Sequence, residues 1–296
     1  MSAQTGRRLT RSVLLPAVAW LGFGAVEAHC AEPSAGAPAA AEGSTVRVAG
    51  IVLKWIRGDK EANLRRIEPL VREAAKRGAQ IVCTTECFLD GYAIADKSIP
   101  LDTYRALGEP IPDGPSFRKL AALADELDIH LIAGLLEADD EQRFNTAVLL
   151  GPDGKLVGKY RKQKLQHELV RNTPGSESPI FVTPYGKLGL IICADRTEAD
   201  IVGRICTRGA DLVICPSGGM FGEKKNDPIV QARSRENQIP IVFVHPAEFL
   251  VTGPNGEVIA RELVGDQLLI DPKEIDGPQD SSGVYTIDLP LPSQGM

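Results

Sequence analysis

Histidine is scarce in this chain, and no block of basic residues lies beyond its N-terminal segment. The 296 residues include four histidines and carry a formal net charge of −6. A negative charge with scattered Lys and Arg argues against nucleic acid as the main partner. His167 invites assignment as the base of a Cys–His pair, but no Asn or Asp context marks a residue that would orient it. The scarcity of histidine therefore disfavours that chemistry.

The cysteines lack the spacing of a metal site. Cys83 and Cys87 form a single C-x3-C pair with no second half, so the sequence indicates no metal. Cys83, Cys193 and Cys215 each close an apolar run, which predicts positions in a buried sheet rather than in cross-linked loops. If Cys193 stays free and Cys30 lies in a spacer, the sequence leaves open whether the remaining four pair: Cys83, Cys87, Cys206 and Cys215.

The N-terminal residues have the pattern of a targeting segment. Three arginines precede the apolar stretch 13–26, which is too short for an ordinary transmembrane helix. We expect residues 1–28 to be a secretory signal peptide, with an uncleaved anchor as the alternative. The pair Arg7–Arg8 suggests twin-arginine export. The Ala/Pro-rich residues 29–44 predict a disordered spacer, and the mature protein is expected to be periplasmic or secreted, with no stable membrane span.

From residue 45 onward, strand-like and helix-like segments alternate. Amphipathic stretches predict helices over 60–77 and 117–127, and Pro69 should kink the first or cost it a hydrogen bond. A Pro-Asp-Gly turn predicts a hairpin between two later strands. Strands are predicted at 46–54, 80–84, 129–135, 146–151 and 155–160.

A second set of similar segments follows the hairpin. Strands are predicted at 180–183, 188–193, 211–215 and 241–245, with helices ending near 207 and covering 227–238, and a mainly β region at 249–289. The stretches RGAQIVC (77–83) and RGADLVIC (208–215) resemble each other, which predicts two related halves of one domain. This alternation predicts an α/β fold in which helices cover sheets.

The stretch KLGLIICADRTEAD (187–200) places a thiol directly after an apolar strand. Thr197 and Asp200 have the spacing of a capping box, which predicts the start of a helix. Backbone N–H groups at a helix start would favour a thiolate at Cys193. By itself, the pattern is more typical of a buried structural thiol.

Two further segments carry charged residues that could serve such a thiol. Glu86, in TTECFLDGY, follows the strand 80–84 at its carboxyl end, where the sites of α/β proteins gather. Lys162, in KYRKQKLQHELVRNTPG (159–175), could hold a cation near a thiolate and then near an oxyanion. Taken singly, the glutamate could be a surface residue and the lysine part of a solvated basic run.

Together the three segments resemble the nitrilase superfamily of carbon–nitrogen hydrolases. ECFLDGY (86–92) is similar to the family's glutamate motif, Tyr160–Arg161–Lys162 to its lysine motif, and GLIICAD (189–195) to its cysteine motif. The similarity continues in the family's order and spacing from Val46 to Leu289. Three motifs in order are far more specific than any one of them. Residues 45–296 are therefore identified as a carbon–nitrogen hydrolase domain.

The resemblance implies a four-layer α-β-β-α sandwich with three catalytic residues at strand ends. These are Glu86, Lys162 and Cys193; Lys164 would replace the lysine if the register were shifted by two. The family's second glutamate corresponds to Glu168, with Glu177 as the alternative. The resemblance further implies no metal or organic cofactor, a small-molecule amide or carbamoyl substrate, and a homo-oligomer.

The resemblance also implies the reaction and the substrate contacts. Cys193 would attack an amide or N-carbamoyl carbon to form a thioester, and ammonia or an amine would leave. Ala194, Tyr92 and His245 are the expected oxyanion and substrate-binding residues. Ala194 replaces a frequent aromatic residue, which should enlarge the pocket, and Ala194–Asp195 in place of Trp-Glu disfavours nitriles. Acyl transfer and a catalytically silent binding protein remain the alternatives.

Overall fold

The computed structural model describes residues 45–219, 221–264 and 282–290. The predicted signal peptide (1–28) and spacer (29–44) lie outside the described residues, as does Cys30.

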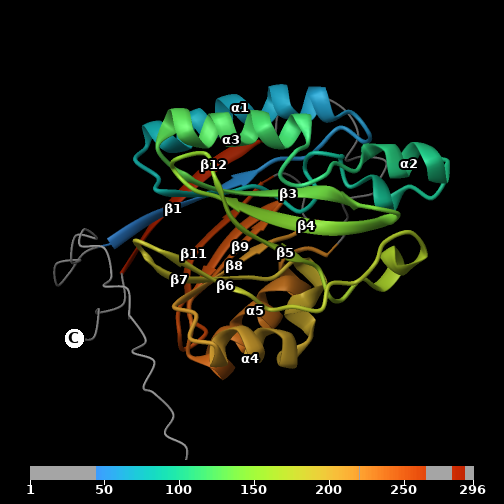
Figure 1. Ribbon diagram of the computed structural model, residues 1–296. Helices are drawn as coiled ribbons and strands as arrows, with labels where there is room; N and C mark the ends of the chain where they lie inside the picture. Colours follow the sequence, from blue (N-terminus) through green and yellow to red (C-terminus); the bar gives the residue numbers. More distant parts are fainter. Residues whose placement is uncertain (1–44, 220, 265–281, 291–296) are drawn as a thin grey trace, which may run out of the picture. The chain divides into compact units, whose positions relative to one another are not determined.

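Two six-stranded sheets form the centre of the fold (Figure 1). The first sheet has the order β12-β1-β2-β3-β4-β5, and the second has the order β11-β10-β9-β8-β7-β6. The strands of the first are β1 (Thr45–Val52), β2 (Ile81–Cys83), β3 (His130–Asp139), β4 (Gln142–Leu150), β5 (Leu156–Arg161) and β12 (Gly283–Pro290). Those of the second are β6 (Ile180–Thr183), β7 (Gly186–Leu190), β8 (Leu212–Pro216), β9 (Ile241–His245), β10 (Glu248–Thr252) and β11 (Val258–Leu263).

The two sheets repeat one arrangement of strand directions. In the first, β1, β2 and β3 are parallel, and the flanking β12, β4 and β5 pair antiparallel. In the second, β7, β8 and β9 are parallel, and β6, β10 and β11 pair antiparallel. The segments RGAQIVC and RGADLVIC lead into β2 and β8, which hold the same place in their sheets. The prediction of two related halves is confirmed.

Helices cover the outer face of each sheet. In Figure 1, α1 (Lys60–Lys76) and α3 (Pro115–Leu127) lie on the first sheet, and α4 (Ala199–Thr207) and α5 (Glu223–Asn237) lie on the second. The short helix α2 (Leu101–Leu107) lies to one side, and single 3-10 turns occur at η1 (Ala93–Ala95), η2 (Gln166–Val170) and η3 (Cys193–Thr197). The predicted α-β-β-α sandwich is confirmed. Among the described helices, none has the length and apolar character needed to cross a membrane.

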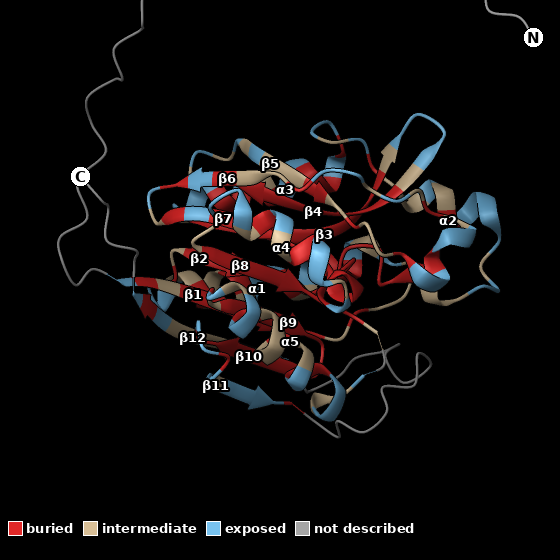
Figure 2. Ribbon diagram, turned by 90° about the horizontal axis from the view of Figure 1, so that it is seen from below, coloured by how far each residue is buried: buried red, intermediate tan, exposed pale blue. Residues whose placement is uncertain are grey.

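Strand β1 shows how one strand serves two cores. Val48 and Val52 pack in the cluster that fills the space between the sheets, whereas Ala49 and Ile51 pack with α1 and α3. This follows from the alternation of side chains along a strand, and burial on both faces accounts for the continuous apolar run in its sequence. Figure 2 shows the central strands buried and the edge strand β11 exposed.

Helix α1 runs from Lys60 to Lys76 as one helix through Pro69, which has no N–H to donate, and its buried stripe packs along the first sheet and α3. One local prediction is wrong. The predicted capping box is absent, since the Thr197 hydroxyl donates to the Ala194 carbonyl and Glu198 takes the N-cap position of α4 without a side-chain hydrogen bond. The chain first forms the turn η3 and only then starts the helix.

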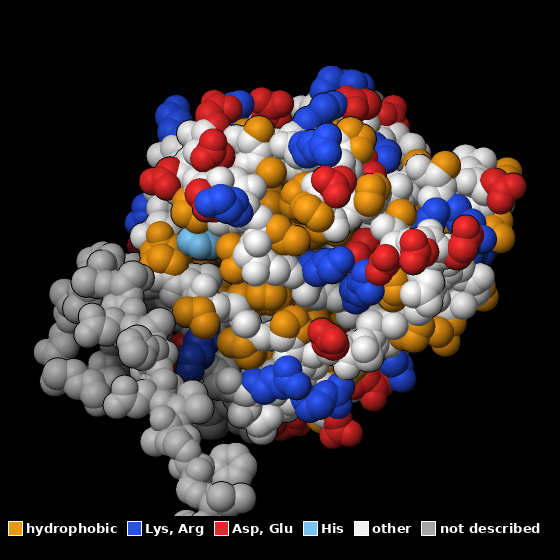
Figure 3. Space-filling model, viewed as in Figure 1, with side chains coloured by type: hydrophobic (Ala, Val, Ile, Leu, Met, Phe, Trp, Pro, Cys, Tyr) orange, Lys and Arg blue, Asp and Glu red, His pale blue; other side chains and the backbone are white. Residues whose placement is uncertain are grey.

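Acidic and basic side chains are interspersed over the face shown in Figure 3. Arg72 on α1, for example, bridges Glu68 on its own helix and Glu126 on α3. Exposed pairs of this kind contribute little to stability because water and salt screen them. The ion pairs that matter for function are buried.

Candidate active site

A buried lysine lies between two buried glutamates at one end of the first sheet. Lys162 follows β5 directly, Glu86 is the third residue after β2, and Glu168 belongs to η2. The Nζ atom of Lys162 is 2.6 Å from Oε1 of Glu86 and 2.5 Å from Oε1 of Glu168. Burial alone would lower the pKa of Lys162, but the charges of Glu168 and Glu86 outweigh it and raise the pKa well above its usual value. The lysine is a permanent cation.

Hydrogen bonds distinguish the two glutamates. The Asn145 amide donates to Oε1 of Glu86 (2.8 Å) and to Oε2 of Glu168 (3.0 Å). The Asn172 amide donates to the same Oε2 of Glu168 (3.2 Å), and its own oxygen accepts from the Tyr104 hydroxyl. Both oxygens of Glu168 are thus occupied, whereas Oε2 of Glu86 is buried without a partner. Of the two, Glu86 has an oxygen available to accept a proton.

Cys193 lies in a strained turn of the second sheet's half. It is the third residue after β7 and has a φ of +47°, in the left-handed region that a side chain with a Cβ rarely adopts. Such strain persists where the surrounding structure imposes it, and functional sites are where it gathers. The Sγ–H group donates to the Gly218 carbonyl, 3.3 Å away.

The thiol of Cys193 is protonated at rest. Burial raises its pKa, and the charge of Glu86 raises it further, against the opposing charges of Lys162 and Arg196. The predicted lowering of the pKa by a helix start does not prevail, because η3 is a single turn and the sulfur is buried. The nucleophile therefore needs a base to remove its proton.

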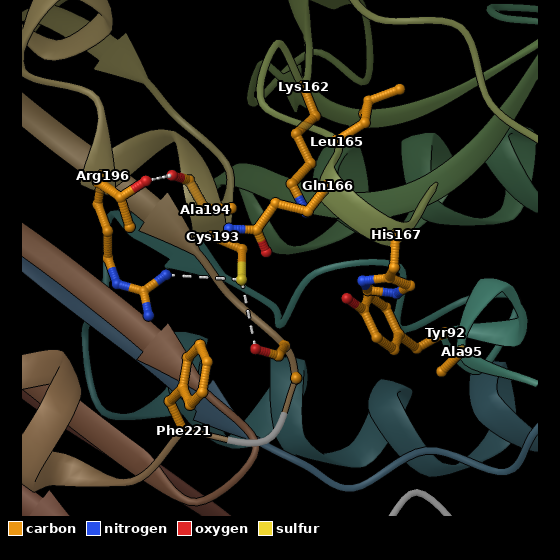
Figure 4. Close-up of a pocket in the computed structure, with 13 residues that line it drawn as sticks. Tyr92, Ala95, Lys162, Leu165, Gln166, His167, Cys193, Ala194, Arg196 and Phe221 are labelled. Atoms are coloured by element: carbon orange, nitrogen blue, oxygen red, sulfur yellow. Dashed lines mark hydrogen bonds between the residues drawn. The ribbon is translucent and has the colours of Figure 1, made fainter. Parts of the chain in front are cut away.

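Cys193 and Lys162 open onto one cavity of about 280 Å³ (Figure 4). Tyr92 and Ala194, two of the residues predicted to bind substrate, line this cavity together with His167. Burial lowers the pKa of His167, whose ring lies edge-on to Tyr92. A largely apolar wall with a few polar groups is typical of a small-molecule site.

Gly218 brings the sulfur and the base to one point. Its carbonyl accepts a hydrogen bond from the Cys193 thiol. A Cβ added to Gly218 would lie 2.9 Å from Oε2 of Glu86 and 3.0 Å from the Trp55 ring. Only a residue without a side chain fits there without displacing its neighbours. The free oxygen of Glu86 and the thiol thus both lie against Gly218.

Asp195 joins the nucleophile's turn to the lysine's strand end. Its carboxylate accepts hydrogen bonds from the backbone N–H groups of Ile192, Gln163 and Lys164 and from the Tyr160 hydroxyl, at 2.7–3.1 Å. Burial is the main cause that raises the pKa of Asp195, to about 6. From the sequence, Asp195 stands out only as part of the cysteine motif, where Ala194–Asp195 replaces Trp-Glu.

The remaining predicted residues lie outside the cavity wall. The buried ring of His245 lies next to the backbone of Gly219, with Nε2 3.3 Å from the Gly219 carbonyl. Its Nδ1 accepts a hydrogen bond from the Ala247 N–H. Burial lowers the pKa of His245 to about 3, so the ring is neutral. Glu177 is exposed and Lys164 pairs with Glu198 near the surface, so neither alternative assignment belongs to the buried cluster.

The cysteines of the described ranges are all free, which answers the pairing question left open by the sequence for these five residues: Cys83, Cys87, Cys193, Cys206 and Cys215. Within the same ranges, no three His, Cys, Asp or Glu side chains are arranged to hold a metal ion.

Several functional residues were not assigned roles from the sequence. Asn145 lies inside the buried strand β4, and an amide in an apolar strand was the available signal. Asn172, Arg196 and Gly218 follow no pattern that distinguishes them from ordinary loop residues. Their roles depend on partners far away in the sequence.

Comparisons with known proteins identify the family. The family model for carbon–nitrogen hydrolases matches residues 46–270. Omega-amidase NIT2 of Mus musculus is 35% identical over 219 residues, which cover 69% of this chain and 75% of the relative. Omega-amidase NIT2 of Xenopus tropicalis is 33% identical over 228 residues, which cover 68% of this chain and 79% of the relative.

Solved structures share the fold. Nit3 of Saccharomyces cerevisiae, a member of branch 10 of the nitrilase superfamily, superposes with a TM-score of 0.69 at 24% identity, covering 83% of this chain and 90% of that one. An amidase from Nesterenkonia sp. gives 0.68 at 24% identity, covering 84% and 92%. The chain therefore belongs to the carbon–nitrogen hydrolase family of the nitrilase superfamily, and it is an amidase-like enzyme that hydrolyses amide carbon–nitrogen bonds by the cysteine mechanism of that superfamily.

Proposed function

We propose that Cys193 is the nucleophile of this hydrolase, Glu86 its general base and acid, and Lys162 the cation that stabilises the oxyanion. Glu168 is a positioning residue for the lysine. The observation that carries this assignment is the free Oε2 of Glu86, which lies against Gly218, the residue whose carbonyl accepts from the Cys193 thiol, while Oε1 is held by Lys162 and Asn145.

Acylation follows from these positions. Oε2 of Glu86 takes the thiol proton, and Sγ of Cys193 forms a bond to the carbonyl carbon of the amide. The oxygen of that carbonyl takes the electron pair and is stabilised by Nζ of Lys162 and the backbone N–H of Ala194. Donors of this kind each lower the barrier by roughly 3–4 kcal/mol in a water-poor site.

Collapse of the tetrahedral species restores the carbonyl and breaks the carbon–nitrogen bond. The leaving nitrogen takes its proton from Glu86, and ammonia or an amine departs. The same carboxylate then removes a proton from water, which attacks the thioester carbon. The carboxylic acid leaves, and the returned proton restores the thiol of Cys193.

We infer a small carboxamide as the substrate class. The cavity of about 280 Å³ accommodates a short carbon chain, and the relatives named above are omega-amidases. In solved structures of an amidase from Nesterenkonia sp. AN1, one mutant carries the acetamide moiety of fluoroacetamide on its active-site cysteine, and a second mutant is in complex with butyramide. Ammonia release from a panel of small amides, N-carbamoyl compounds and nitriles tests the inference; preference for a nitrile would contradict it.

The catalytic assignment is tested by replacing the sulfur. Cys193→Ala should lower amide turnover by at least about 10⁴-fold while leaving the circular dichroism spectrum and unfolding midpoint unchanged. Cys206→Ala, at a half-buried thiol on α4, is the matched control and should keep wild-type turnover. Native-rate hydrolysis by the Cys193 variant would refute the assignment.

We further propose that the protein is exported and assembles as a homo-oligomer. Export is supported by the arginines and apolar stretch of residues 1–28, and oligomerisation by the family resemblance alone. Mass spectrometry of the mature N-terminus should find cleavage near residue 28, and light scattering should give a multiple of the chain mass. An intact N-terminus or a monomer mass would contradict the respective proposal.

A further inference from the structure

A second cation, besides Lys162, lies against the nucleophilic sulfur. Arg196 is 4% exposed and belongs to the same turn as Cys193, and its Nη1 is 3.6 Å from Sγ (Figure 4). Within the described ranges, no carboxylate lies within salt-bridge distance of its guanidinium. A buried guanidinium without a carboxylate partner is costly unless another charge compensates for it.

Neutral groups hold this guanidinium in place. Nη2 of Arg196 donates to Oδ1 of Asn226 on α5 at 2.5 Å, and the Asn226 amide in turn donates to the Phe221 carbonyl. The guanidinium carbon lies 5.3 Å from the centre of the Phe243 ring, within range of a cation–π contact. Nε is buried without a partner. The Asn226 amide and the Phe243 ring orient the guanidinium without neutralising it, so its positive charge remains next to the sulfur.

We propose that Arg196 is a further catalytic residue, whose guanidinium donates a hydrogen bond to the Cys193 thiolate, and that Asn226 is a positioning residue that holds it there. The proposal rests on the proposed role of Cys193. When the thiol proton moves to Oε2 of Glu86, the negative charge on Sγ turns the Nη1–H contact into a charge-assisted hydrogen bond.

The two cations then serve different stages of the reaction. The electron pair of the sulfur forms the Sγ–carbon bond, and the π pair of the carbonyl moves to the substrate oxygen, where Lys162 stabilises the negative charge. When the thioester is hydrolysed, the carbon–sulfur bond breaks and the pair returns to Sγ, where Arg196 stabilises the leaving thiolate until Glu86 supplies its proton. Each cation faces the atom that is negative at that stage.

The other groups around the sulfur are accounted for. Glu86 and Lys162 face it from the first sheet's half, and Tyr92, whose pKa burial raises well above its usual value, faces it as a neutral phenol. On the far side of Arg196, burial raises the pKa of Cys215 to about 12 and lowers that of His245 to about 3, so both are neutral at pH 7. A change in the titration of Cys193 on replacing Arg196 thus reports the lost guanidinium.

The test measures the rate at which iodoacetamide alkylates Cys193 as a function of pH, with the labelled peptide identified by mass spectrometry. In Arg196→Met, the midpoint pH should rise by about 1–3 units, because an opposite charge within 4–6 Å shifts a pKa by that amount. Turnover of a neutral aliphatic amide should fall by about 10–100-fold in kcat. Arg196→Lys should show a smaller shift, and Asn226→Leu a shift in the same direction.

Arg204→Gln is the matched control. Arg204 lies on α4, is exposed, and donates to the Gln163 side chain. Its replacement removes one positive charge from the same region and should leave the midpoint unchanged. If Arg196→Met does not fold, Arg196→Gln takes its place, since it keeps a donor for Asn226 and removes the charge.

An unchanged alkylation midpoint in a folded, neutral Arg196 variant overturns the proposal. So does a variant whose only defect is a raised KM for amides that carry a carboxylate, because Arg196 would then anchor a substrate anion. Failure of the proposed function is seen separately, in Cys193→Ala turnover that stays at the native rate. The two failures are therefore distinguishable.

Discussion

The two halves of the molecule share a backbone plan and differ in the side chains at their strand ends. Ser217 after β8 donates its N–H to Val244 of β9, as Thr84 after β2 donates to Ile132 of β3. Val264 after β11 donates its N–H to the Ala247 carbonyl in the same way that Lys162 after β5 donates to Asn145. The repeat of strand order thus extends to individual hydrogen bonds.

The chemistry does not repeat with the backbone. Where the first half has Lys162, the second has Val264, and where the second half has Cys193 three residues after β7, the first has Trp55 three residues after β1. One half supplies the carboxylate and the amine, and the other supplies the sulfur. The fold thus provides equivalent positions in both halves, and the identity of the side chains at these positions decides function.

Apart from loss of the sulfur itself, the largest effect on turnover should come from removing the first half's carboxylate. Glu86→Gln keeps the shape but leaves no base for the thiol proton, so kcat for a small amide should fall by about 10²–10⁴-fold in steady-state assays. Ser217→Ala, at the corresponding strand end of the second half, is the matched control and should change kcat little. Equal losses of kcat in both variants would show that the two strand ends do not differ in function.

A smaller loss of turnover should follow when the Asp195 contact between the two halves is weakened. Asp195→Asn places an amide where three backbone N–H groups and the Tyr160 hydroxyl need an acceptor. We expect unfolding free energy, measured by urea denaturation, to fall by about 2–4 kcal/mol, with kcat reduced as well. Unchanged stability would show that the halves do not depend on this contact.

Gly218→Ala tests the point where the halves touch. The added methyl group would meet Oε2 of Glu86 and the Trp55 ring at 3.0 Å or less. We expect a cost of about 1–3 kcal/mol in thermal or urea unfolding, as for other overpacked sites, and a lower kcat because the base is displaced. Alanine at Gly203, where an added Cβ would meet one atom at 3.8 Å, should be tolerated.

The smallest effect concerns Glu248, which starts β10 and pairs with Leu263 as Thr146 of β4 pairs with Arg161. Burial and the neighbouring Asp227 raise the pKa of Glu248 to about 9, above the ordinary 4.5. The folded state therefore binds a proton that the unfolded state releases, and stability falls as pH rises between these values.

Glu248→Gln removes this titration. The variant should be more stable than the wild type by about 1–3 kcal/mol at pH 8, with a difference that shrinks toward pH 4.5. Urea unfolding across pH 5–9 measures both curves. If the unfolding free energy of the variant changes with pH in parallel with that of the wild type, Glu248 is already ionised in the folded protein.

Sequence motifs located the catalytic candidates because each follows an apolar strand, and strand ends are readable as interruptions of a pattern. Glu86, Lys162 and Cys193 were found in this way, as was the pairing of the halves from two similar segments. The helix start after Cys193 was misread, because local spacing favoured a capping box whereas packing around Asp195 favours a separate turn. Local pattern is weak evidence wherever a buried charged group competes for the backbone.

By itself, the sequence determined the family, the layered α/β architecture, and which side chains are available for chemistry. Only the tertiary structure decided which glutamate has a free oxygen, how Gly218 brings that oxygen beside the sulfur, and that Arg196 faces the thiol with Asn226 as its partner. The reason is physical. Hydrophobic periodicity is a property of neighbouring residues, whereas hydrogen-bond occupancy and burial are set by groups tens of residues apart that meet only when both sheets have packed.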